Sequence, residues 1–434
     1  MAVSVRSTRG YETGNVFEAF FRGAAPDGGL YMLDGLPSVE DLLNHAGSTV
    51  PSFHRLAGTI LDRLFGEQPP DEGWHELAYR AFPFAPALSR VGNHLILELF
   101  HGPTCAFKDF GASFLAQVLQ SERSRRGDRI TVLTATSGDT GGAVGAAFEG
   151  IEGIDVVILY PSGRISKLQE KQLTTLGDNI TAVEVEGAFD DCQRMVKEVF
   201  ADTAFCRERG ITSANSINLG RLVPQSLYYM WAAAELSTER KIPFFCVPSG
   251  NFGNLTAGIM AFRNGMPAGG FIAATNANDV VPSYLYSGTY EPRESIATIS
   301  NAMDVGSPSN FERLQTMFGG DHRAMAALIH GQSINEAATR ETMHRYFDEF
   351  GVHVCPHTAV GLAAADRYGI GSTDAGATSV VLATAHPGKF AETVKDATGV
   401  YPHMPERLQR VLDAPGNSLT MPADSAALRE WLDS

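Results

Sequence analysis

The sequence predicts an α/β fold with mainly parallel sheets, and a repeated order of elements is the main reason. Three short apolar or β-branched runs are each followed by a small-residue turn and then a helical pattern: RITVLTA at 129–135, IDVVILY at 154–160 and PFFCV at 243–247. Strands that alternate with helices form parallel sheets covered by helices on both faces. The composition agrees, because 44 glycines, 44% hydrophobic residues and 19% charged residues are typical of a globular chain with many tight turns.

The sequence pattern divides the chain into three predicted units. At 434 residues, the chain exceeds a typical single domain. Residues 1–84 lack the rhythm of strands and helices and contain the Pro- and acid-rich stretch EQPPDEGW, so we expect a small N-terminal domain there. Residues 85–235 hold two of the strand and helix units, and residues 236–434 hold the remainder. We therefore expect two α/β units behind a smaller first domain.

The charge and the cysteines argue against several classes of protein. A formal net charge of −15 disfavours binding to nucleic acid or to an anionic membrane, since both attract basic surfaces. The five cysteines are odd in number and form no CxxC pair, which disfavours a disulfide framework and favours a reducing cytoplasm. No apolar signal segment opens the sequence, and no run approaches the roughly 18 apolar residues of a membrane span. We expect a cytoplasmic monomer or homodimer that acts on a small molecule.

Two glycine-rich loops follow predicted strands and are candidate anion-binding sites. GNFGN at 250–254 opens a predicted helix, where glycines allow close backbone approach and free N–H groups attract phosphate. TSGDTGG at 136–142 has the same position after another strand, although an ordinary turn or helix N-cap would explain such a loop equally well. The nucleotide fingerprints GxxxxGK[ST] and, after a strand, GxGxxG are missing. A phosphorylated cofactor other than a nucleotide is therefore favoured.

The stretch HGPTCAFKDFG at 101–111 places Lys108 between Phe107 and Phe110. Such a lysine can be a surface residue whose stem packs on aromatic rings while its ammonium reaches water. A lysine held in a partly apolar cleft instead has a lowered pKa, and its free amine can form a Schiff base. Pyridoxal phosphate would need a phosphate-binding loop beside that lysine, and GNFGN is a candidate for it.

Basic residues after the next strands are candidates for holding an anionic substrate. PSGRISKLQEKQ supplies Arg164 and Lys167, and NSINLGRLVPQS supplies Arg221. Arg164 stands close to a predicted strand end beside Ser162, where a planar guanidinium can clamp a phosphate group. Local positive charge of this kind is how an acidic protein attracts an anion.

A metal site is not expected. His353, Cys355 and His357 have a spacing that resembles a metal-binding helix. Pro356 disfavours a continuous helix through the two histidines, and no cluster of acids and cysteines supports them.

Taken together, these stretches resemble the threonine synthase family, pyridoxal phosphate enzymes of fold type II in the tryptophan synthase β-like group. The motifs that carry the resemblance follow one another along nearly the whole chain: STRG at 7–10, APDGGLY at 25–31, HGPTCAFKDFG at 101–111, TSGDTGGA at 136–143, SINLGRL at 216–222, PSGNFGN at 248–254, MDVGSPSNFER at 303–313, PHTAVG at 356–361 and TAHPGKF at 384–390. The resemblance implies two α/β units with mainly parallel sheets around a central cleft, plus a small N-terminal domain.

The resemblance also implies roles for individual residues. Lys108 would form the Schiff base with the cofactor, Thr384 would meet the pyridine nitrogen, and Asp139 would lie near the cofactor. The cofactor phosphate would be held by Gly250, Asn251, Phe252, Gly253 and Asn254. The substrate α-carboxylate would be bound by the loop of Ser137, Gly138, Asp139 and Thr140, and the substrate phosphate by Ser162, Arg164, Lys167, Asn215 and Arg221.

The implied reaction converts O-phospho-L-homoserine and water into L-threonine and phosphate. Alternatives remain open from the sequence: a related phospho-lyase that releases phosphate and a 2-keto acid, another dehydratase of the same fold, or a binding protein that has lost catalysis. The intact Lys108, both loops and Thr384 argue against the last of these. Two departures from the family pattern, Cys105 and Cys355, stand where an apolar residue and an acid are more common.

Overall fold

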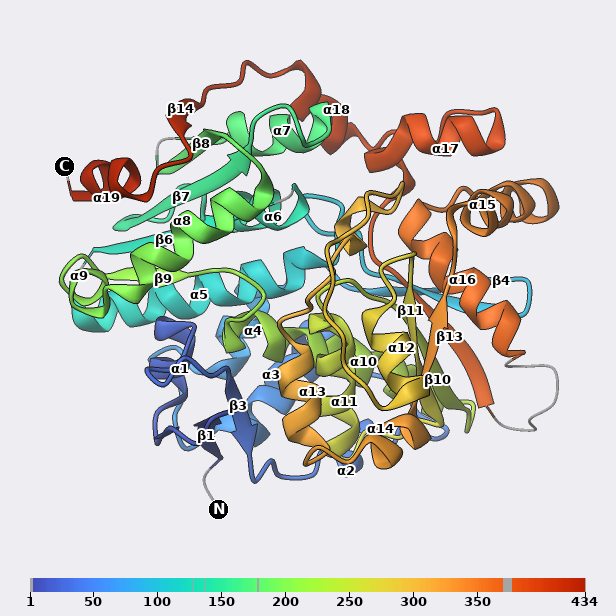
Figure 1. Cartoon of the computed structure of the whole chain (residues 1–434). Helices are drawn as coiled ribbons and strands as arrows, with labels where there is room; N and C mark the ends of the chain where they lie inside the picture. Colours follow the sequence, from blue (N-terminus) through green and yellow to red (C-terminus); the bar gives the residue numbers. More distant parts are fainter. Residues whose placement is uncertain (1–2, 128, 137, 178, 370–376, 434) are drawn as a thin grey trace.

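The computed structural model describes residues 3–127, 129–136, 138–177, 179–369 and 377–433. In this described part, the strands form three sheets (Figure 1). A small antiparallel sheet has the order β2-β1-β3, a six-stranded sheet has the order β12-β11-β10-β13-β5-β4, and a five-stranded sheet has the order β14-β8-β7-β6-β9. The strands are β1 Ser4–Ser7, β2 Glu12–Thr13, β3 Tyr31–Asp34, β4 Ala87–Val91, β5 His94–Glu98, β6 Ile130–Ala135, β7 Ile154–Pro161, β8 Ile180–Glu186, β9 Ile211–Ser213, β10 Ile242–Pro248, β11 Gly270–Thr275, β12 Ile329–Ser333, β13 Ala377–Ala383 and β14 Leu419–Pro422.

The two larger sheets are mainly parallel, as the rhythm of strands and helices predicts. All pairs in the five-stranded sheet are parallel, and in the six-stranded sheet only β4 runs antiparallel, to β5. Parallel strands end at the same edge of a sheet, so the loops that follow them gather there. The predicted α/β class with mainly parallel sheets is therefore confirmed.

The N-terminal sheet packs with helices α1 to α4, and helices cover both faces of the larger sheets. The first group is α1 Val16–Arg22, α2 Glu40–Leu43, α3 Phe53–Phe65 and α4 Trp74–Ala81. Around the five-stranded sheet lie α5 Lys108–Arg126, α6 Asp139–Phe148, α7 Lys167–Thr174, α8 Phe189–Ala201, α9 Thr203–Glu208 and α19 Ser425–Asp433, and α18 Glu406–Asp413 packs on α7. The remainder are α10 Leu219–Ser237, α11 Gly253–Arg263, α12 Val280–Ser287, α13 Phe311–Met317, α14 His322–Leu328, α15 Glu336–Phe350, α16 Pro356–Tyr368 and α17 Ala391–Thr398, with the 3-10 helices η1 Asn301–Met303 and η2 Pro387–Phe390.

The sheets do not follow the predicted division of the chain in two places. Strands β4 and β5 lie within residues 85–235 but pair in the six-stranded sheet through β13. Strand β14, near the C-terminus, returns to the edge of the five-stranded sheet and pairs with β8 (Figure 1). The boundaries at residues 84 and 235 stay a prediction, and both larger sheets are built from segments distant in the sequence.

Helix α5 connects the hydrophobic cores. One side of it, with Phe110 and Phe114, packs into the core that holds the N-terminal helices, and the opposite side, with Leu115 and Leu119, packs against the five-stranded sheet. The spacing of these residues places two apolar stripes on one helix. The helix ends at Gly127, whose φ of +77° is the left-handed conformation that glycine adopts without strain. The first residue of this central helix is Lys108.

The described helices include none that is both long and apolar enough to cross a membrane. In the same part of the chain, no group of three His, Cys, Asp or Glu side chains is arranged to hold a metal ion. His357, one of the three metal-like residues of the sequence, lies in the first turn of α16, and Cys355 is the N-cap of that helix. The Cys355 Sγ accepts a hydrogen bond from the Thr358 N–H at 3.4 Å, so it fills the capping role of an acid.

Candidate active site

A cavity of about 1430 Å³ opens where the carboxyl ends of the two larger sheets meet. Its lining includes residues that directly follow or end β6, β9, β10 and β13, namely Thr136, Ser213, Pro248 and Thr384. Lys108 and the loop 250–254 also line it. The cavity therefore lies where ligands of parallel α/β sheets are usually bound.

The backbone around Lys108 is attached to the end of β13. Ala106 forms an antiparallel bridge with Ala385, and the Phe107 N–H donates to the Thr384 carbonyl oxygen at 2.8 Å. Cys105 adopts a left-handed φ of +57°, which turns the chain into helix α5. These contacts hold the lysine at a defined place at the cavity wall.

The two phenylalanines beside Lys108, Phe107 and Phe110, have different structural roles. Phe110 is fully buried, with its ring centroid 5.4 Å from that of Phe53 and 5.5 Å from that of Tyr228. Phe107 lines the cavity, and the Lys108 Nζ lies 5.9 Å from its ring centroid. One ring thus anchors the helix, and the other provides an apolar wall beside the amine.

The acid that follows the lysine points away from it. Asp109 is completely buried and accepts hydrogen bonds from the Thr104 N–H at 2.9 Å and the Thr104 Oγ1 at 2.6 Å. A Cβ on Gly102 would lie 2.4 Å from the Asp109 Oδ2, so glycine is required there. Burial raises the pKa of Asp109 to about 6, against the hydrogen bonds from Thr104. Asp109 closes the turn before the helix and leaves Lys108 free to face the cavity.

The environment of Lys108 favours its uncharged form. Burial lowers the pKa of Lys108 to about 8, and the positive charges of Lys389 and Arg221 act in the same direction. The carboxylate of Asp139 opposes them. Roughly a tenth of the Lys108 amine is therefore free at pH 7, far more than for an ordinary lysine, and a nucleophilic lysine needs the free amine.

Asp139, the first residue of α6, is shared between two lysines. Its Oδ1 lies 2.9 Å from the Lys389 Nζ and accepts a hydrogen bond from the Gln169 Nε2 at 3.2 Å. Burial alone would raise the pKa of Asp139, but the charges of Lys389 and Lys108 outweigh it and hold that pKa well below its ordinary value. Asp139 is thus a buried anion at the cavity wall.

The loop 250–254 forms a cradle of backbone amides at the start of helix α11. Phe252 has a left-handed φ of +58°, and the helix begins at Gly253. Among the described residues, the N–H groups of residues 250–254 donate to no acceptor. A Cβ on Gly250 would lie 2.6 Å from the Met303 Cα, so a larger residue could not keep this backbone path. Free amides at a helix N-terminus fit a phosphate group.

Side chains of the same loop hold its shape. The Asn251 Nδ2 donates to the Ser216 Oγ at 2.6 Å, and the Asn251 Oδ1 accepts from the Ser309 N–H at 2.6 Å. The Asn254 Nδ2 donates to the Pro248 carbonyl oxygen at 2.9 Å. The two asparagines thus fix the loop, while its amides stay available.

Several other predicted residues also line the cavity. Arg221 is 3% exposed, its Nη1 donates to the Ala214 carbonyl oxygen, and its Nε has no partner among the described residues. Burial lowers the pKa of Arg221 to about 10. The Asn215 Oδ1 accepts from the Thr134 hydroxyl, and Thr140 lies at the wall in the first turn of α6. Gly138, the N-cap of α6, has a φ of +132°, and Ser137 lies outside the described residues.

Three predicted phosphate-binding residues are not among those that line the cavity. Ser162 donates from its Oγ to the Glu184 Oε1 at 2.6 Å. Arg164 and Lys167 are exposed at the start of α7. A capping box between Ser166 and Gln169 begins this helix. Their contact with a substrate stays a prediction.

Two residues at the site were quoted within motifs but received no role from the sequence. Lys389 follows β13 in η2 and pairs with Asp139. His357 lines the cavity, and its Nε2 accepts a hydrogen bond from the Ala302 N–H at 3.2 Å. Burial lowers the pKa of His357 to about 4, so it is neutral at physiological pH. Their only signal in the sequence is their place in TAHPGKF and PHTAVG.

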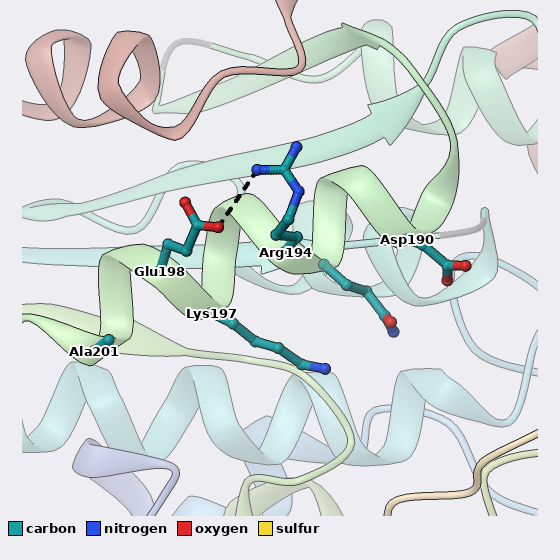
Figure 2. Close-up of a pocket in the computed structure, with 6 residues that line it drawn as sticks. Asp190, Arg194, Lys197, Glu198 and Ala201 are labelled. Carbon is teal, nitrogen blue, oxygen red and sulfur yellow. Dashed lines mark hydrogen bonds and ion pairs between the residues drawn. The ribbon is translucent and has the colours of Figure 1, made fainter. Parts of the chain in front are cut away.

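A shallower hollow of about 430 Å³ lies along helix α8 (Figure 2). Figure 2 shows Arg194 and Lys197 on different sides of the helix, with the Arg194 Nη1 3.4 Å from the Glu198 Oε1. Asp190, Gln193, Lys197 and Ala201 line both this hollow and the large cavity. The hollow is therefore an outer margin of the cavity, lined by a charged helix face.

Comparison with known protein families agrees with this geometry. A model described as pyridoxal-phosphate dependent enzyme matches residues 81–385, and one described as threonine synthase, C-terminal, matches residues 358–432. Threonine synthase of Escherichia coli (strain K12) is 41% identical over 423 residues, which cover 96% of this chain and 95% of the relative. Threonine synthase of Saccharomyces cerevisiae is 34% identical, with coverages of 94% and 92%.

Solved structures give the same relationship. PLP-bound threonine synthase from Brucella melitensis matches with a TM-score of 0.90 and 34% identity over 99% of both chains. Threonine synthase from Escherichia coli matches with a TM-score of 0.88 and 39% identity, also over 99% of both chains. Maize serine racemase, at 17% identity and a TM-score of 0.53 over 71% of this chain, is similar in fold alone.

Proposed function

The chain belongs to the threonine synthase family of pyridoxal phosphate-dependent enzymes, and from this premise we propose that it converts O-phospho-L-homoserine and water into L-threonine and phosphate. The predicted family and cofactor are confirmed, as is the fold of the fold type II enzymes. The observation that carries the proposal is the half-buried amine of Lys108 in the same cavity as the amides of 250–254. A covalent attachment point and a phosphate cradle in one cavity are what this cofactor needs.

The residues present fit the cofactor. Lys108 would hold its aldehyde carbon, the amides of 250–254 would hold its phosphate, and Thr384, at the end of β13, would meet its ring nitrogen. Asp139 would lie beside it as a fixed anion. When bound, pyridoxal phosphate withdraws electrons from the substrate Cα and so makes the proton there easier to remove.

The remaining steps are assigned to groups of this chain. The Lys108 amine, once free, takes the proton from the substrate Cα and returns one there, for which a pKa of about 8 is well suited. The loop with Gly138 and Thr140 binds the substrate α-carboxylate, together with Ser137. Asn215 and Arg221 bind the leaving phosphate, since both line the cavity and Arg221 has an unused donor.

Ser162, Arg164 and Lys167 complete the phosphate site only if the start of α7 moves toward the cavity. Such closure over the substrate would also exclude water until it is needed. Hydrogen exchange of residues 162–174 tests this directly. Protection that increases with substrate supports closure, and unchanged exchange removes these three residues from the proposal.

The enzyme is proposed to work in the cytoplasm as a monomer or a homodimer. The five cysteines of the chain are free, which suits a reducing compartment. Size measurement in solution at several protein concentrations decides between the two states of assembly.

A single-turnover experiment tests the activity. The purified protein is mixed with O-phospho-L-homoserine, and free phosphate and threonine are followed together, with Lys108→Ala alongside. We expect equal amounts of both products from the native protein and neither from the variant. Phosphate accompanied by a 2-keto acid would instead identify a phospho-lyase, and an intact cofactor absorbance without products would exclude this substrate.

A further inference from the structure

We propose that Lys389 is a positioning residue: it pairs with the Asp139 carboxylate as a counter-ion, and this pairing allows Lys108 to lose its proton. Asp139 lines the cavity, whereas its partner Lys389 is not among the described residues that do so. Lys389 therefore acts on Lys108 by pairing with Asp139 and by its own positive charge, without touching cofactor or substrate. The inference rests on the proposed attachment of the cofactor to Lys108, and it does not depend on the substrate.

The geometry of the pair is specific. The Lys389 side chain is 0% exposed and that of Asp139 is 5% exposed, with 2.9 Å between Nζ and Oδ1. Lys389 lies in η2, five residues after Thr384, and Asp139 begins α6 directly after β6. The ion pair thus joins the carboxyl ends of the six-stranded and five-stranded sheets. Apart from this ion pair, the Lys389 Nζ has no hydrogen-bond partner among the described residues.

The charges in this cluster explain why a second lysine is needed. A buried carboxylate requires a cation, and the positive charges of Lys389 and Lys108 both act on Asp139. If Lys389 were absent, the Asp139 carboxylate would have to pair with the Lys108 ammonium. Loss of the Lys108 proton would then leave the Asp139 carboxylate buried without a cation. With Lys389 present, the carboxylate keeps its partner whether Lys108 is charged, neutral or bonded to another group.

The other groups around the cluster do not replace Lys389. On α16, His357 is neutral because burial lowers its pKa to about 4. Arg221 on α10 is a cation, and it acts on Lys108 by lowering the pKa of that lysine. Asp109 on α5 is held by Thr104, and Gln169 on α7 is uncharged. Lys389 is thus the cation in ion-pair contact with Asp139.

A purely structural role would make the pair only a clamp between the two sheets. A clamp would affect the stability of the protein but not the proton equilibrium of Lys108 once the fold is intact. The proton equilibrium is therefore the decisive quantity, and it can be measured without substrate.

The experiment titrates the Lys108 amine in the full chain from which the cofactor has been removed. The rate of modification by an amine-specific reagent is measured against pH, and modification at residue 108 is quantified by mass spectrometry. The variants are Lys389→Met, which keeps the length of the side chain without its charge, Asp139→Asn, and the double variant. Lys395→Met is the matched control, because Lys395 is an exposed lysine on α17 whose Nζ donates to the Tyr401 hydroxyl.

We expect a midpoint near pH 8 for the native chain and for Lys395→Met. Lys389→Met should raise the midpoint by about one pKa unit or more, because Asp139 then pairs with Lys108. Asp139→Asn should lower the midpoint, and the double variant should return to within about half a unit of the native value, because opposite charges have been removed together. An unchanged midpoint in Lys389→Met, or a double variant that stays as high as Lys389→Met, would overturn the proposal.

If Lys389→Met does not fold, the titration midpoints of Lys108 in Asp139→Asn and in the double variant still test the proposal. Neither contains an unpaired buried carboxylate at this position. A higher midpoint in the double variant than in Asp139→Asn supports the proposal, since the two differ only by the charge of Lys389, which depresses the Lys108 pKa. Equal midpoints in the two variants would show that Lys389 has no influence on Lys108.

Discussion

A polar cluster lies near each end of strand β13, and the two clusters differ in how completely their atoms are paired. Toward the amino end, the His94 ring is hydrogen-bonded through Nδ1 to the Ser379 Oγ and through Nε2 to the Asp366 Oδ1, both at 2.8 Å. Arg345 provides Asp366 with a second partner. None of these four residues is among the described residues that line the cavity.

At the carboxyl end of β13, the polar groups line the cavity or pair with a residue that lines it. The Lys389 Nζ has only an ion pair, the Arg221 Nε has no partner among the described residues, and the amides of 250–254 donate to no described acceptor. Ser, His and Asp in a row at hydrogen-bonding distance would by residue type suggest a catalytic triad. The comparison shows that access and unused donors mark the site, whereas a fully satisfied cluster without a cavity stabilises the fold.

The largest expected effect is a difference in catalytic rate between two single alanine variants, one near each end of β13. Lys108→Ala should lower the rate of threonine formation by at least about 1000-fold, because the covalent and proton-transfer functions are lost together. Ser379→Ala should leave kcat within about threefold. Steady-state kinetics of both variants at saturating cofactor measures this difference, and a large loss of kcat in Ser379→Ala would contradict the assignment of that cluster to stability.

The next effect concerns the stability of the fold. His94→Leu should lower the free energy of unfolding by about 1–3 kcal/mol, because it leaves the buried Ser379 hydroxyl without a partner and removes one of the two partners of Asp366. Urea denaturation measures this loss, with the exposed His344→Leu on α15 as control. The kcat of the folded His94 variant should stay near the native value. A stability equal to that of the control would mean that the cluster contributes little.

A smaller effect is expected from the cradle. Gly250→Ala should weaken the binding of pyridoxal phosphate by about 10–100-fold, because the new Cβ meets the Met303 Cα and displaces the amides. Equilibrium titration of the cofactor measures the change. Gly14→Ala is the matched control, since nothing lies within 4 Å of a Cβ added there. Native affinity in Gly250→Ala would argue against this loop as the phosphate site.

The smallest effect is a difference in pH dependence. Burial alone would raise the pKa of Asp366, but the hydrogen bonds with His94 and Arg345 outweigh it and lower the pKa. A carboxyl whose pKa is lowered by folding stabilises the protein above its unfolded pKa of about 4, and this stabilisation is lost as the pH falls through the folded value. As the pH falls below about 4, the free energy of unfolding should therefore decrease less in Asp366→Asn than in the native chain.

Denaturation at a series of pH values measures this slope, with the exposed Asp348→Asn on α15 as control. Equal slopes for the native chain and Asp366→Asn would show that the ion pair at this end of β13 does not respond to acid.

The chemistry of the site could be predicted where it depends on neighbours in the sequence. The aromatic residues beside Lys108 make it a candidate, and the motif around it assigns its role by resemblance to the family, while glycines between a strand and a helix indicate the loop 250–254. Both features are local, because φ angles, helix starts and free amides are set within a few residues. Arg164 and Lys167 were less predictable, since the residue types suit phosphate but both residues are exposed at or near the start of α7.

The sequence by itself determined the α/β class, the family, the lysine and the loops that can receive a phosphorylated cofactor. Only the tertiary structure decided that β4, β5 and β14 cross the expected boundaries and that Lys389 meets Asp139 from 250 positions away. It also decided which of two polar clusters faces a cavity. The physical reason is that local conformation follows from adjacent residues, whereas the pairing of charges and the presence of space depend on how whole sheets and helices pack.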